Sequence, residues 1–301
     1  MRTELIDTIG VQNTLGEGVT WDPRTGCVLW TDIAEMKLYR LHFETRNYEC
    51  FELPDRLGSF GLTEDENILI CAFSFGFAYY NFQTQSVSKQ IRIEDQWPGI
   101  RMNDGRLDPQ GRFWAGSMVE DHDRAPPHGA RLYSIEGDRV KTHLSDVEIS
   151  NGLAWSLSGD HMFFTDTPTQ KIYRFDYNQD DGSLSNKTLF AELPSGAFPD
   201  GSIVDREDYL WNAQWGAAKV VRYSSKGHED YELKLPVSQP TCLTFGGDDM
   251  NIIFITTARE GLSGSQLENE PEAGNLFIYK SNVTGLKSNQ FYKLTGNETN
   301  E

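Results

Sequence analysis

The amino-acid sequence predicts an all-β protein, a six-bladed β-propeller with four antiparallel strands per blade, formed as one domain by residues 1–301. First, a short motif recurs at intervals of 43, 44, 47, 49 and 41 residues. Second, aromatic residues make up 12% of the chain, and aromatic residues favour strands. Third, no long segment shows the apolar period of a helix. Four short strands in a unit of roughly 45 residues are typical of a propeller blade.

The recurring motif is expected to form the first strand of each blade. It is a polar or aromatic residue followed in most copies by glycine and then by an apolar segment. The sixth copy is degenerate. The copies begin at Glu17, Phe60, Asp104, Asn151, Asp200 and Thr241.

The second and third strands follow each motif in a fixed order. A polar turn leads into an aromatic segment, which we expect to be the second strand at 28–32, 113–116, 162–166 and 210–213. The third strand is expected at 37–41, 130–134, 171–175 and 219–223. A more polar fourth strand closes most units. A pair of β-sandwiches with accidental similarity is the alternative, but the constant order of strands and turns favours the propeller.

Both ends of the sequence resemble strands, at residues 4–11 and 290–294. We expect these two segments to pair with each other in the last blade. Such pairing would close the ring and leave no exposed strand edge.

Composition excludes several classes of partner. The net charge of −18 argues against nucleic acid, because a phosphate backbone requires clustered Lys and Arg. No apolar run approaches the roughly 18 residues of a membrane span, and the first residues lack the apolar core of a signal peptide. The four cysteines are scattered and flanked by apolar residues, so we expect buried thiols in a reducing, cytoplasmic environment.

The residue before the repeated glycine is expected to face the propeller axis, because the innermost strand of each blade lines the channel. Four of the six positions carry an oxygen ligand, namely Glu17, Asp104, Asn151 and Asp200. These groups would repel one another unless a cation neutralised them. Carboxylate and amide oxygens suit one divalent ion such as Ca²⁺, Mg²⁺ or Mn²⁺, and Zn²⁺ also accepts them.

Two alternatives remain at these positions. Asn103 could replace Asp104 as the inward group, since adjacent residues of a strand face opposite ways. Asn-Gly and Asp-Gly are also common turn dipeptides that need no metal. Four positions in phase, one of them a glutamate, favour the metal.

Other polar and aromatic residues have weaker assignments. Asp32 and Asp166 follow second strands and are expected to form turns. The six histidines are dispersed, and only His122 and His128 are candidates for a pocket rim. Three aromatic residues could form an apolar wall beside the metal or belong to the core: Trp97, Phe198 and Trp215.

The motifs at 15–18, 101–105, 113–118, 150–156 and 199–201 together resemble those of the senescence-marker-protein/gluconolactonase family of regucalcin-like proteins. The resemblance implies that Glu17, Asn151 and Asp200 bind the metal, with Asn103 as a further ligand or a substrate contact. It also implies that Arg101 orients the substrate. The family's acidic loop residue would fall on Glu120 or Asp121, of which Asp121 is taken as the substrate contact.

Members of that family are typically lactonases acting on sugar aldonolactones, and some hydrolyse other esters or organophosphates. We therefore expect a metal-dependent lactonase in which the ion polarises the lactone carbonyl and Asp200 is the general base. Arg101 and Asn103, two residues apart on one strand, would hold sugar hydroxyls. A phosphotriesterase or arylesterase on the same ion, and a non-catalytic calcium-binding propeller, are the alternatives. The expected partner is a small sugar lactone, and the chain is expected to be a monomer.

Overall fold

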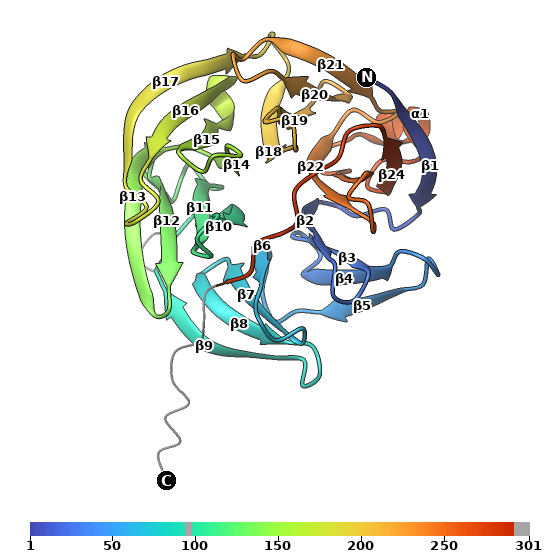
Figure 1. The fold of residues 1–301 in the computed structure, drawn as a ribbon. Helices are drawn as coiled ribbons and strands as arrows, with labels where there is room; N and C mark the ends of the chain where they lie inside the picture. Colours follow the sequence, from blue (N-terminus) through green and yellow to red (C-terminus); the bar gives the residue numbers. More distant parts are fainter. Residues whose placement is uncertain (94–97, 292–301) are drawn as a thin grey trace.

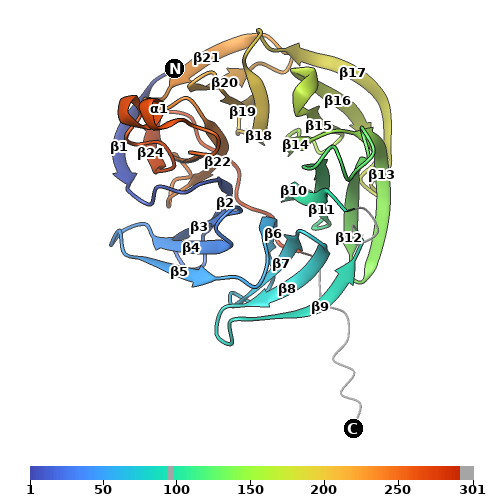
Figure 2. The ribbon, with the colours of Figure 1, turned by 180° about the vertical axis from the view of Figure 1, so that it is seen from behind.

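The computed structural model describes residues 1–93 and 98–291. Six four-stranded antiparallel sheets surround one axis, as Figure 1 shows from one end and Figure 2 from the other. The predicted six-bladed β-propeller is therefore confirmed.

The first five blades each take four consecutive strands, from the axis outward. Blade one contains β2 (Gly16–Asp22), β3 (Cys27–Asp32), β4 (Lys37–His42) and β5 (Tyr48–Glu52). Blade two contains β6 (Leu57–Leu62), β7 (Ile68–Phe73), β8 (Gly76–Asn81) and β9 (Ser86–Arg92). Blade three contains β10 (Ile100–Leu107), β11 (Phe113–Val119), β12 (Ala130–Glu136) and β13 (Arg139–Val147). Blade four contains β14 (Ser150–Trp155), β15 (His161–Asp166), β16 (Lys171–Tyr177) and β17 (Leu184–Glu192). Blade five contains β18 (Phe198–Val204), β19 (Leu210–Trp215), β20 (Lys219–Tyr223) and β21 (Glu229–Lys234).

The sixth blade closes the ring with the first strand of the chain. Its order is β22 (Pro240–Gly246), β23 (Ile252–Thr257), β24 (Leu276–Ser281) and then β1 (Thr3–Ile9). The prediction that residues 4–11 join the last blade is confirmed, but the predicted partner is wrong. An insertion that carries α1 (Gly264–Asn269) delays the third strand, so β24 takes the place next to β1. Gln290 and Phe291 form no strand, and 292–294 lie outside the described residues.

The chain then returns to the axis as a segment that we call the C-terminal strap, residues 282–291. Figure 1 shows it crossing the centre of the ring. Gly285 forms an isolated bridge with Asp205, and the backbone N–H of Phe291 donates to Leu62 O at 2.8 Å. Leu62 is the last residue of β6 and Asp205 directly follows β18, so the strap links two blades across one end of the channel.

Burial decreases from the axis to the rim. Residues of the inner strands β6, β14 and β22 are all buried, whereas most of β13 and β21 is partly or fully exposed. Large aromatic side chains fill the space between sheets, and Trp114 and Trp211 are fully buried. Their indole N–H groups donate to Asp108 and Asp205 at 2.9 and 2.8 Å, so neither leaves an unpaired donor in the core.

The cysteine prediction is correct for three of the four residues. Cys27, Cys71 and Cys242 are buried free thiols. Cys50 is exposed, because it lies on the outermost strand β5. Within 1–93 and 98–291, no helix has the length and apolar character needed to cross a membrane.

Candidate metal and substrate site

Five polar residues meet where the inner strands begin. Glu17 lies on β2, Asn103 and Asp104 on β10, Asn151 on β14 and Asp200 on β18. Each is at most 7% exposed. The structure thus brings together the four oxygen-bearing residues that the repeat placed at the axis, with Asn103 beside them.

The ionisation of the three carboxyl groups shows that they are close to one another. Burial, followed by the negative charge of Asp104, raises the pKa of Glu17 to about 8. Burial and the charges of Glu17 and Asp104 raise the pKa of Asp200 well above its usual range. Burial also raises the pKa of Asp104, and the positive charge of Arg106 partly offsets this rise. Buried carboxylates that raise one another's pKa values in this way need a nearby positive charge to remain ionised at neutral pH.

The available ligand atoms fit a divalent cation. Asp200 Oδ1 is buried and accepts no hydrogen bond from the described residues, so it is an unused anionic ligand. Within the described chain, no three His, Cys, Asp or Glu side chains gather closely enough to hold a metal. An ion here would therefore need an amide oxygen beside the carboxylates of Glu17 and Asp200. Oxygen ligands of this kind suit a hard cation.

Asn151 has the orientation that such a ligand requires. Its Nδ2 donates to Thr167 Oγ1 at 2.9 Å, and Thr167 Oγ1 donates to Pro199 O at 2.9 Å. These bonds leave Asn151 Oδ1 facing Asn103, whose Nδ2 donates to it at 3.1 Å. A carbonyl oxygen has a second lone pair. Thr167, which begins the 3₁₀ turn Thr167–Thr169, was not identified from the sequence.

Asn103 and Asp104 both lie at the axis, although strict strand alternation allowed only one of them to face it. Met102 pairs with Ser117 and Gly105 with Ala115, so two residues of β10 oppose one residue of β11. This is a β-bulge, in which alternation is locally lost. Asp104 Oδ2 accepts from the backbone of Leu153 at 3.2 Å and therefore links blade three to blade four.

Arg101 and Asn103 lie on the same side of β10, as expected. Arg101 Nη1 donates to Asn103 Oδ1 at 2.8 Å. Asn103 therefore directs its nitrogen, not its oxygen, toward Asn151. In this arrangement Asn103 holds a ligand in place and connects it to Arg101.

Glu120 is the acidic loop residue that contacts Arg101, with Arg101 Nε donating to Glu120 Oε1 at 3.1 Å. Asp121 instead accepts from the backbone of Asp123 at 3.1 Å, within its own loop. Arg101 pairs with Met118 of β11, and Glu120 follows directly after Val119, the last residue of that strand. The choice between Glu120 and Asp121 therefore depends on a strand register that the sequence alone did not contain.

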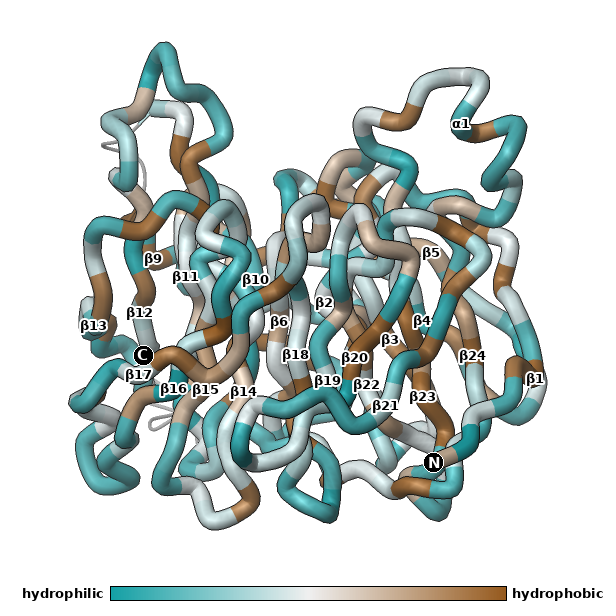
Figure 3. The backbone as a smooth tube through the Cα atoms, turned by 90° about the horizontal axis from the view of Figure 1, so that it is seen from above, coloured by the Kyte–Doolittle hydropathy of each residue, from teal (hydrophilic) through white to brown (hydrophobic). Residues whose placement is uncertain are grey.

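A second arginine contacts Glu120, and two histidines lie further along the loop that Glu120 begins. Arg56, which precedes β6, donates to Glu120 from its Nη1 at 2.5 Å. His122 and His128 are exposed and approach the two oxygens of Glu148 at 3.2 and 3.5 Å. Figure 3 shows that the segment with α1 projects beyond the blades.

The remaining aromatic candidates lie beside the start of β2. Trp215 packs against a small cluster of Leu15, Ile33 and Ala258, and Phe198 is its register partner on β18. These contacts favour a core role for Trp215. Trp97 lies outside the described residues.

Asp32 forms the predicted turn, with Oδ1 accepting from Glu35 N at 3.2 Å, whereas the Asp166 side chain makes no such bond in the turn that follows it; both side chains have a further structural role. Asp32 accepts from the backbone N–H groups of Thr14 and Leu15 at 2.8 and 3.1 Å. Asp166 accepts from Ile149 at 2.9 Å. Each aspartate therefore anchors the segment that leads into an inner strand, just before Glu17 or Asn151.

Comparison with known proteins gives consistent similarities. The sequence profile of the SMP-30/Gluconolactonase/LRE-like region matches residues 15–259. The chain is 34% identical to L-arabinolactonase of Azospirillum brasilense, over 96% of this chain and 95% of that protein. It is 33% identical to 6-deoxy-6-sulfogluconolactonase of Pseudomonas putida, over 91% and 93% of the two chains. The crystal structure of regucalcin from Agrobacterium tumefaciens, described as a calcium-binding protein, superposes with a TM-score of 0.90. The two share 27% identity over 96% of this chain and 98% of that one.

Proposed function

We propose that this chain, which belongs to the SMP-30/gluconolactonase/LRE-like family, is a metal-dependent lactonase that opens the ring of sugar aldonolactones. The observation that carries the proposal is the buried group of Glu17, Asn151 and Asp200, joined by hydrogen bonds to Asn103 and Arg101. A protein that only stored a cation would not need Asn103 and Arg101 beside these three residues. The two relatives named as sugar lactonases cover more than nine-tenths of the chain.

Glu17, Asn151 and Asp200 would hold the ion. When bound, it would supply positive charge to the lactone carbonyl as the tetrahedral oxyanion develops. It would also lower the pKa values of the nearby carboxyl groups and keep them ionised.

Asp200 is the proposed general base. Its Oδ1 is buried and accepts no hydrogen bond from the described residues, so it is free to hold the ion, and the other oxygen of the Asp200 carboxylate would take the proton from the attacking water. Its backbone oxygen accepts from Asn212 Nδ2 at 2.8 Å, which holds the strand in position. A positioned base of this kind contributes about 10²–10⁴-fold to the rate.

Arg101 and Glu120 are the proposed substrate contacts at the entrance to the site. Arg101 is 5% exposed, and its guanidinium is held by Glu120 and Asn103. Its remaining N–H groups can donate to sugar hydroxyls, which are neutral acceptors. Glu120 takes the role that was first expected of Asp121, because it is Glu120 that contacts Arg101.

A panel of γ- and δ-aldonolactones in a pH-indicator assay tests the proposal. Untreated protein should hydrolyse at least one sugar lactone, chelator should abolish the activity, and one divalent ion should restore it. Asp200→Asn keeps an oxygen at the position of the ligand but removes the base, so kcat should fall about 10²–10⁴-fold.

Asp249→Asn changes an exposed carboxylate in the loop between β22 and β23 and is the matched control. Paraoxon and phenyl acetate added to the panel separate the lactonase from the phosphotriesterase and arylesterase alternatives. Full activity in Asp200→Asn would remove the base assignment. Absence of chelator-sensitive hydrolysis of every lactone would remove the proposed function.

A further inference from the structure

A cavity of about 340 Å³ lies in the channel on the side of the strap. Its walls begin directly after the candidate metal site, because Gly18 follows Glu17 and Gly105 follows Asp104. Strap residues 286–289 form another part of the wall. The cavity contains none of the proposed ligands or substrate contacts in its lining, so it is a separate space on the same axis.

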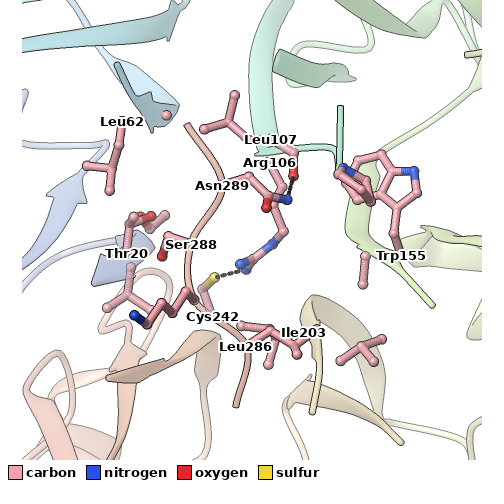
Figure 4. Close-up of a pocket in the computed structure, with 18 of the residues that line it drawn as sticks. Thr20, Leu62, Arg106, Leu107, Trp155, Ile203, Cys242, Leu286, Ser288 and Asn289 are labelled. Atoms are coloured by element: carbon pink, nitrogen blue, oxygen red, sulfur yellow. Dashed lines mark hydrogen bonds between the residues drawn. The ribbon is translucent and has the colours of Figure 1, made fainter. Parts of the chain in front are cut away.

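Most of the wall is apolar. Figure 4 shows Leu62 and Trp155 on opposite sides of the cavity, with Ile203 and Leu286 together along a third side. Its volume falls within the range of small-molecule sites, which are usually apolar with a few placed polar groups. A sugar lactone, with a hydroxyl on most carbons, does not match such walls.

The charged groups of the wall have one sign. Arg106 and Lys287 line the cavity, and no Asp, Glu or His does, in a chain whose net charge is −18. Figure 4 shows Arg106 extending across the space toward Cys242. Its Nη2 is 3.9 Å from Cys242 Sγ and 3.5 Å from Leu243 O, both weak contacts. Its Nε is buried and has no partner among the described residues.

Asp104 and Glu17 attract Arg106 electrostatically, but the acidic residues at the other ends of the inner strands pair with different arginines. Asp22, Asp108 and Asp205 lie at the ends of inner strands or just beyond them, and each is paired with another arginine. The pairs are Arg24–Asp22 at 2.8 Å, Arg112–Asp108 at 3.3 Å and Arg222–Asp205 at 2.8 Å. In the described parts of the chain, neither Arg106 nor Lys287 has a carboxylate within 4.0 Å. The ring carboxylates lie beyond the glycines, and a cation bound there would offset their charge.

We propose that this strap-side cavity binds a small amphipathic carboxylate, a medium-chain fatty acid. The carboxylate would accept from Arg106, including its unpaired Nε, and the hydrocarbon would lie along Leu62, Trp155 and Ile203. Burial of an unpaired guanidinium donor is unfavourable, and a charge-assisted bond to a carboxylate would satisfy it. Lys287 at the strap would add a weaker, solvent-exposed attraction.

Isothermal titration of the whole protein, loaded with its preferred divalent ion, tests this with three probes of equal chain length: decanoate, decanol and decyltrimethylammonium. Decanoate should bind with one site per chain and at least tenfold more tightly than either other probe. Arg106→Gln should weaken decanoate binding about 10–100-fold, the range for a lost bond to a charged group. Ile203→Trp should abolish binding by filling the cavity.

Lys287→Gln changes an exposed strap residue and should weaken decanoate binding up to about fivefold. Lys226→Gln, on an exposed turn of blade five, is the matched control and should change nothing. The proposal is overturned if decanol binds as tightly as decanoate. It is also overturned if Ile203→Trp and Lys287→Gln, both with wild-type unfolding midpoints, retain full decanoate affinity.

Discussion

At the scale of single residues, the candidate metal site depends on hydrogen bonds that decide which atom of each amide faces the axis. Asn151 presents its oxygen because its nitrogen is bound to Thr167, and Asn103 presents its nitrogen because its oxygen is bound to Arg101. The sequence predicts these residue types at the axis but not their orientations. The orientations follow from side-chain contacts within blades three and four, and from the bond that ties Thr167 to Pro199 of blade five, none of which the repeat contains.

Thr167 should control metal affinity without contacting the metal. In Thr167→Val the donor to Pro199 and the acceptor for Asn151 are both lost, so the Asn151 amide is free to rotate. We expect the dissociation constant for the preferred divalent ion to rise about 10–100-fold, as for other groups that orient a ligand. Titration calorimetry measures it directly. Thr167→Ser keeps the hydroxyl and should bind like the wild type. Equal affinity in Thr167→Val and Thr167→Ser would contradict this role.

His143 should make stability depend on pH far from the metal site. It stacks on Trp114 with ring centroids 4.0 Å apart and bonds Ser134 Oγ at 2.7 Å. Burial and the charges of Lys141 and Arg112 lower the pKa of His143 from 6.5 to about 4. The unfolded chain therefore binds more protons between these values. The contribution of neutral His143 to the free energy of unfolding is therefore complete above about pH 6.5 and is lost as the pH falls toward 4.

Thermal unfolding at several pH values measures the effect of His143. From pH 7 to pH 4 the wild type should lose about 2 kcal/mol through this group, allowing for its partial exposure. His143→Phe keeps the stacking and should lack that loss. The stabilities of the two proteins should therefore approach each other as the pH falls. His228→Phe, on an exposed turn, should follow the wild type. Parallel pH profiles for His143→Phe and the wild type would contradict the assignment.

At the scale of elements, the inner strands were predictable because each repeats one motif. The irregularities within them were not. Pairing of the inner strand with its neighbour is irregular in all six blades near the start of the strand. The bulge in β10 allows Asn103 and Asp104 to share the axis. A bulge depends on the pairing of two strands, so the alternation expected of one strand could not reveal it.

The edge strand β1 should be necessary for the stability of the sixth blade. Without it, the buried strand β24 would expose an unpaired edge. Deletion of residues 1–9 should lower the midpoint of thermal unfolding by about 5 °C or more, since several backbone hydrogen bonds are lost. It should also increase self-association in sedimentation. Leu5→Lys, at an exposed position of β1, keeps the pairing and is the control. An unchanged midpoint in the deletion would contradict the role of β1.

At the scale of the whole molecule, ring closure was predictable in principle, because a propeller must pair its ends. The partner was not, because 18 residues that include α1 separate the second and third strands of the last blade, against 2 to 10 residues in the other blades. The strap had no counterpart in other blades, and so the repeat gave no indication of it. The repeat could therefore predict the ring of oxygen ligands, but it could not predict the strap-side cavity.

The proposed function requires one divalent ion at the axis, on which hydrolysis depends. The direct measurement adds Ca²⁺, Mn²⁺ or Zn²⁺ stepwise to chelator-treated protein while bound metal and aldonolactone hydrolysis are followed in the same sample. We predict no hydrolysis without metal and activity that rises in proportion to bound metal. It should reach a plateau at one ion per chain, and Glu17→Gln should shift the curve to much higher metal concentration. Full hydrolysis by the metal-free protein, or a Glu17→Gln curve that coincides with the wild type, would contradict the account.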